Sequence, residues 1–125
     1  MPPRRRTDPA DGRAALQAWR ADPDGVPLAT RRTAVRFALE ELADVAPGNS
    51  VEVRVPPDGA VQAVEGPRHT RGTPPNVVET DPVTWLRLVT GDLAWDDALA
   101  SGRVQASGER ADLAELLPLQ AARPR

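Results

Sequence analysis

The sequence predicts an α+β fold, a mixed sheet of about four to five strands covered on one face by helices. Two observations lead to this prediction. Apolar residues alternate with polar ones in some short stretches and recur at helical spacing in others, so the chain mixes strands with helices. Two of the strands are joined by a tight turn, and the helices are grouped before and after the strands, which is typical of α+β domains.

Two helices are expected ahead of the first strand. The first spans residues 11–21 and carries Leu16 and Trp19 on one side. The second spans residues 30–45, where apolar side chains recur at i, i+3, i+4 and i+7 and most charged residues lie away from that stripe. Pro47 and Gly48 then end the second helix.

A β-hairpin follows. Val51, Val53 and Val55 alternate with Glu52 and Arg54, as expected of a half-buried strand. The sequence Pro-Pro-Asp-Gly at 56–59 favours a tight turn, because proline presets φ and glycine accepts unusual backbone angles. Residues 60–65 are the expected returning strand.

The C-terminal half is expected to begin with a strand at 76–80 and a helix with clear start and stop signals. Asp81 is the predicted N-cap, Pro82 the first helical residue, and Gly91 the left-handed stop. A short helix at 95–101 and a strand at 103–107 follow. Three leucines, Leu113, Leu116 and Leu117, predict a final helix over 111–117, ended by Pro118.

Length and composition limit the function. A chain of 125 residues favours one domain, placed at 11–119 between an Arg/Pro-rich tail at 1–10 and a tail at 120–125 that are both expected to be disordered. The net charge of −2 argues against a nucleic-acid partner. Cysteine is absent, which excludes disulfides and thiol chemistry. No apolar run approaches the roughly 20 residues of a membrane span, so we expect a cytoplasmic protein without stable membrane insertion.

The C-terminal half resembles sterol-carrier-protein-like domains, and the resemblance extends over residues 30–119, most closely to the small bacterial branch of that family. The motifs that carry it are Asp-Pro-Val-Thr-Trp-Leu at 81–86, Gly-Asp-Leu at 91–93, Ala-Leu-Ala-Ser-Gly-Arg-Val at 98–104 and Ser-Gly at 107–108. The resemblance implies a sheet of about five strands with an apolar tunnel between sheet and helices. It further implies a sterol, fatty acyl chain or acyl-CoA as ligand.

Seven apolar residues are the predicted wall of such a ligand site, because clefts for apolar ligands need apolar walls with few polar groups. The competing interpretation is an ordinary core at helical spacing. The residues are Trp85, Leu88, Val89, Trp95, Leu99, Leu113 and Leu117.

The loop at 66–75 contains the residues with the most chemical character, Arg68, His69 and Arg71. Two guanidinium groups beside a histidine suit a phosphate or carboxylate head group. The alternative is a solvated loop whose arginines pair with nearby acids. Catalysis by His69 ranks last, because no nucleophile and orienting acid stand with it at a recognisable spacing.

The sequence therefore predicts a non-enzymatic carrier or binding domain for an apolar or acyl-chain ligand, with no catalytic residues, no metal site and no cofactor. The alternative is a protein-interaction or accessory module with a closed core and no lipid transport. Its motive is the scarcity of bulky, flexible side chains to line a tunnel, since the chain has one Phe and one Met, the latter at position 1.

Overall fold

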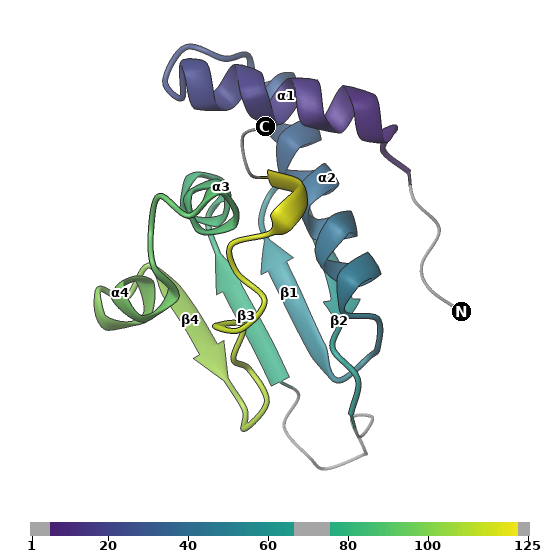
Figure 1. The fold of residues 1–125 in the computed structure, drawn as a ribbon. Helices are drawn as coiled ribbons and strands as arrows, with labels where there is room; N and C mark the ends of the chain where they lie inside the picture. The colour runs from purple at the N-terminus through teal and green to yellow at the C-terminus, as the bar shows by residue number, and fades with distance from the viewer. Residues whose placement is uncertain (1–5, 67–75, 123–125) are drawn as a thin grey trace.

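The computed structural model describes residues 6–66 and 76–122 (Figure 1). The elements follow in the order α1 (Pro9–Ala21), α2 (Leu28–Val45), β1 (Val51–Val55), β2 (Gly59–Ala63), β3 (Asn76–Thr80), α3 (Pro82–Thr90), α4 (Trp95–Ala100), β4 (Val104–Ser107) and the 3-10 turn η1 (Gln120–Ala122).

The strands form one sheet in the order β2-β1-β3-β4. β1 pairs antiparallel with β2 and parallel with β3, and β3 pairs antiparallel with β4. Val53 stands opposite Val61 on one side and Val78 on the other, so the valines share a face. The predicted α+β fold with a four-strand mixed sheet packed against helices is confirmed for the described part of the chain.

Burial shows which face of the sheet the helices cover. Val51, Val53 and Val55 are fully buried, whereas Arg54 between them is exposed. The opposite face carries polar side chains, among them Glu79, which lies 4.0 Å from the guanidinium of Arg54. The sheet therefore has an apolar face toward the helices and a polar face toward solvent, as the alternation in its strands predicts.

α1 lies on α2, away from the sheet (Figure 1). Its start differs from the prediction, because the carboxylate of Asp8 accepts a hydrogen bond from the backbone N–H of Ala10 at 2.9 Å and Pro9 occupies the first turn. Gly12 allows the two helices to approach closely, since a Cβ on this residue would lie 2.3 Å from Cγ of Phe37. The apolar side of α1 thereby adds Leu16 and Trp19 to the core.

The β1–β2 turn is bound to α2 by an ion pair and a hydrogen bond. Asp58 is only 1% exposed, and its carboxylate forms an ion pair with Arg31, whose Nε lies 3.2 Å from Oδ2. Arg36 donates from Nε to the backbone carbonyl of Asp58 at 2.8 Å. The sequence prediction treated this aspartate as a turn residue only. The pairing with α2 explains how a carboxylate is buried here without being left unpaired.

One predicted element is wrong at its end, and a second is wrong altogether. The predicted strand 60–65 ends at Ala63, because Val64 adopts φ of 70° and leaves the pleated conformation. The predicted helix over 111–117 is not formed, and this stretch has a single turn around residues 114–116.

The segment of residues 111–119, which we call the C-terminal strap, is irregular for a physical reason. Pro118 has no N–H with which to extend the single turn at 114–116, and the strap forms hydrogen bonds both within itself and to α3. The carboxylate of Asp112 accepts from Ala114 N–H at 2.9 Å, and Leu119 N–H donates to the carbonyl of Val89 at 3.0 Å. Figure 1 shows the strap passing in front of the sheet beside α3.

Candidate functional site

The predicted apolar wall is largely interior. Trp85, Leu88 and Val89 on α3 are at most 1% exposed, Leu113 on the strap is fully buried, and Trp95 at the start of α4 is 6% exposed. All five belong to one core cluster, against which the half-buried Leu117 packs. Leu99 differs, since its side chain is 39% exposed and lies outside that cluster.

Helix α3 holds three of these residues in place because both of its ends are specified. Thr84 donates to the carboxylate of Asp81 through its backbone N–H at 3.1 Å and through its hydroxyl at 2.6 Å. Partial burial acts to raise the pKa of Asp81, but the hydrogen bonds from Thr84 stabilise the carboxylate, and the net pKa lies below its ordinary value. Gly91 ends the helix at φ of 87°.

The same helix is tied to its neighbours on two sides. The indole Nε1 of Trp85 donates to the carbonyl of Val35 on α2 at 3.4 Å. The carbonyl of Val89 accepts from Leu119 on the strap. The strap is therefore the irregular side of an interior whose other sides are helices and the sheet.

Three surface hollows in the described part of the chain have none of the seven predicted wall residues in their lining. The smallest, of about 270 Å³, lies where β3 ends and β4 begins, beside Thr80 and Arg103. The interior wall and the hollows are thus different places on the molecule.

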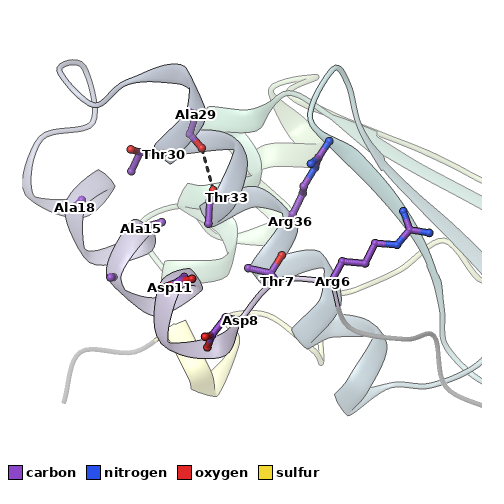
Figure 2. A pocket seen from close by; sticks show the side chains of 11 residues that line it. Arg6, Thr7, Asp8, Asp11, Ala15, Ala18, Ala29, Thr30, Thr33 and Arg36 are labelled. Atoms are coloured by element: carbon purple, nitrogen blue, oxygen red, sulfur yellow. Dashed lines mark hydrogen bonds between the residues drawn. The ribbon is translucent and has the colours of Figure 1, made fainter.

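The largest hollow, of about 690 Å³, lies between α1 and α2. Figure 2 shows Arg6 and Arg36 at one end of it and Ala18 at the other. Several of its polar groups already have partners within the protein. Asp8 caps α1, Arg36 donates to the turn at Asp58, and the hydroxyl of Thr33 donates to the carbonyl of Ala29 at 3.0 Å.

The second hollow, of about 460 Å³, lies at the C-terminal end of α2, between the residues that follow β2 and the strap. Val64 in its wall is a β-branched residue with positive φ. Such a conformation costs roughly 1–3 kcal/mol and persists only where the surroundings enforce it. Here Val64 N–H donates to the carbonyl of Ala46 at 2.7 Å, and its carbonyl accepts from the hydroxyl of Ser50 at 2.7 Å.

Sequence reasoning missed the second hollow, because its residues come from three separated stretches. They are Val45, Ala46, Pro47, Val64, Glu65, Asp112, Glu115 and Leu116. No single stretch has a recognisable motif, and nothing in the sequence marks Val64 as left-handed. The predicted head-group residues Arg68, His69 and Arg71 lie outside the described residues.

Comparison with protein families supports the class that the fold indicates. The mixed sheet and its helical cover agree with the fold that the resemblance to sterol-carrier-protein-like domains implies. Residues 28–119 match the model of the bacterial SCP ortholog family, and the chain belongs to this family. Helix α1 precedes the matched region. No curated protein matches the chain.

Two searches of the described residues bear on the kind of site that the chain carries. No helix among them is both long and apolar enough to cross a bilayer. In the same ranges, 6–66 and 76–122, no group of three or more His, Cys, Asp or Glu residues is placed to hold a metal ion.

Proposed function

We propose that this protein is a non-enzymatic binding or carrier domain for an apolar or acyl-chain ligand, accommodated between the apolar face of the sheet and the strap. Membership of the bacterial SCP ortholog family is the observation that carries the proposal. The continuous apolar layer formed by β1, α3 and the strap adds support, since apolar ligands are bound by surfaces of this composition.

The proposed wall consists of Trp85, Leu88, Val89, Trp95, Leu113 and Leu117. Because the first five are 6% exposed or less, a ligand has to displace part of the present packing. The strap is the part best suited to move. It lacks the repeating backbone hydrogen bonds of a helix or strand, and segments with few such bonds open at lower free-energy cost. We leave Leu99 out of this wall because of its exposure.

Arg68, His69 and Arg71 are the proposed contacts of an anionic head group, on the chemistry of guanidinium groups alone. No catalytic step, metal or cofactor enters this function. The ligand is held by burial of its chain, and its polar end selects among lipids.

The experiment is displacement of a fluorescent fatty acid from the delipidated protein by sterols, fatty acids and acyl-CoAs. Leu117→Gln is the interior variant, and Leu28→Gln, at a residue 66% exposed at the start of α2, is its matched control. We expect saturable displacement that weakens in the interior variant only. Absence of binding in the unchanged protein contradicts the proposal.

Hydrogen exchange provides a second readout of the same event. The N–H of Leu119 donates to Val89 in the closed protein. If ligand enters beneath the strap, this amide exchanges faster in the complex, whereas the amides of α3 stay protected. Binding without any change at Leu119 places the ligand elsewhere.

A second candidate function is a protein-interaction module that does not transport lipid. The observation that favours it is the closed interior, in which Leu88 and Leu113 are at most 1% exposed. Its partner surface is to be sought among the exposed apolar side chains Leu28, Val45 and Val83. A protein that binds lipid and elutes as a monomer without protein partners counts against it.

A further inference from the structure

We propose that the second hollow, at the C-terminal end of α2, binds an amphiphilic organic cation. This inference concerns a surface site outside the proposed interior site, although the strap borders both. It commits to one chemical class, an alkyl or aryl group attached to an amine or quaternary ammonium.

The floor of the hollow is apolar. Val45, the last residue of α2, is 59% exposed. Val64 and Leu116, both half-buried, stand in the same wall. Exposed apolar side chains gathered in one concave place are typical of a binding surface, whereas isolated ones are ordinary.

The rim of the hollow is acidic. Among the described residues that line the hollow, it carries the carboxylates of Glu65, Asp112 and Glu115 and no basic side chain. Within residues 6–66 and 76–122, none of the three forms an ion pair. Arg110 approaches the same turn, with Nη1 3.1 Å from where a Cβ of Gly66 would lie, but it is not part of the wall.

The backbone adds to this negative potential. The hollow lies at the C-terminal end of α2, where the helix dipole is negative, and the last turn of α2 has no basic residue to offset it. Among the described residues, side chains and backbone together therefore favour a cation here.

The arrangement suits an organic cation better than a metal ion. The three carboxylates do not converge, since no group of acidic residues in the described part is placed to hold a metal. A volume of about 460 Å³ lies in the range of sites for small organic ligands. A ligand of this class can place its ammonium group beside the carboxylates and its alkyl or aryl group on the valines.

The wall of the hollow around Val64 is also preorganised. Val64 is held at φ of 70° by the hydrogen bonds of its N–H to Ala46 and of its carbonyl to Ser50. Gly48 packs closely against the same residue, since a Cβ on Gly48 would lie only 2.2 Å from the carbonyl oxygen of Val64. A wall fixed in this way loses little freedom when a ligand binds.

The test uses three probes with the same alkyl chain, decylammonium, decan-1-ol and decanoate, titrated into the full chain by calorimetry and by NMR of the valine and leucine methyl groups. We expect decylammonium to bind most tightly, to shift the methyl signals of Val45, Val64 and Leu116, and to bind more weakly as salt is added. Decanoate should not shift the signals of Val45 and Val64, whereas a shift of Leu116 alone would report entry of the fatty acid beneath the strap.

The decisive variant neutralises the rim, Glu65→Gln with Asp112→Asn and Glu115→Gln. The matched control, Asp24→Asn with Asp96→Asn and Asp97→Asn, changes the net charge equally at exposed positions outside the hollow. We expect about tenfold weaker decylammonium binding in the rim variant and less than about twofold in the control. Equal losses in both, or equal binding of all three probes at the hollow, overturn the proposal. So does the absence of decylammonium binding at these methyl groups.

Discussion

Helix α3 and the C-terminal strap pack side by side on the same core, and both carry leucines at helical spacing, yet only α3 is a helix. The difference lies in the ends. α3 has a side-chain cap at Asp81, a proline in its first turn and a left-handed Gly91 at its end. In the strap, the carboxylate of Asp112 bonds to Ala114 in the way that Asp8 begins α1, but Pro118 has no N–H to carry a helix on from the single turn.

The comparison shows that the residues at the ends of a segment, rather than its leucine spacing, decide whether it forms a regular helix. A regular helix stays in place, whereas an irregular segment can move. α3 is held by its caps and by bonds to α2 and the strap. The strap has buried leucines but little regular backbone bonding. In the proposed carrier, α3 keeps its position when the ligand enters, and the strap is displaced.

The largest expected effect compares two buried leucines, Leu88→Ala in α3 and Leu113→Ala in the strap. Truncating a buried leucine costs roughly 2–5 kcal/mol of unfolding free energy. Leu88 should lie toward the upper end of that range, because fixed surroundings cannot collapse into the cavity. Leu113 should cost less, because the strap can shift. Urea unfolding of both variants measures the difference, and a larger loss at Leu113 would break the comparison.

A smaller effect is expected at the end of α3. Gly91→Ala forces a residue with a Cβ into φ of 87°, a left-handed conformation that costs roughly 1–2 kcal/mol. The added Cβ meets no obstacle, since its nearest neighbour would be Pro118 at 3.5 Å, so the loss reports the backbone alone. Gly102→Ala, at φ of 76° with nothing within 4 Å, is the matched control. Similar losses of unfolding free energy at both glycines are expected, and a neutral Gly91→Ala contradicts the stop role.

At the start of α3, Asp81→Ala should lower the unfolding free energy by about 1 kcal/mol, as is usual for loss of an N-cap. The pKa of Asp81 is lower in the folded protein than its ordinary value. Its stabilising effect is therefore fully present above the ordinary carboxyl pKa and is lost as pH falls toward the folded value. The gap between Asp81→Ala and the unchanged protein should shrink between about pH 7 and about pH 3. A gap that widens on acidification would contradict the assigned role.

The same comparison explains what sequence could predict of the fold. Elements with clear end signals or strict alternation were predicted correctly, such as α3 and the strand Val51–Val55. The strap was predicted as a helix from its leucine spacing, with Pro118 taken as its end. Val64 was predicted to lie in a strand. Its left-handed φ could not be foreseen, because it depends on hydrogen bonds to Ala46 and Ser50, which are distant in sequence.

The candidate site was predictable to a lesser extent. Apolar periodicity identified residues that prove to be interior, such as Trp85 and Leu113, but spacing cannot say whether an interior is packed or hollow. The acidic hollow joins the end of α2, the end of β2 and the strap. Its apolar floor and carboxylate rim become one feature only after these three stretches are folded together.

The smallest expected effect concerns Leu99, the one residue of the predicted wall that faces solvent. Its side chain is 39% exposed and lies outside the core cluster, so Leu99→Ser should change the unfolding free energy by less than about 0.5 kcal/mol. Displacement of the fluorescent fatty acid should also be unchanged, in contrast to Leu117→Gln. Urea unfolding and the displacement assay measure the two quantities on the same variant. A selective loss of ligand affinity in Leu99→Ser would indicate that the ligand enters beside α4 rather than beneath the strap.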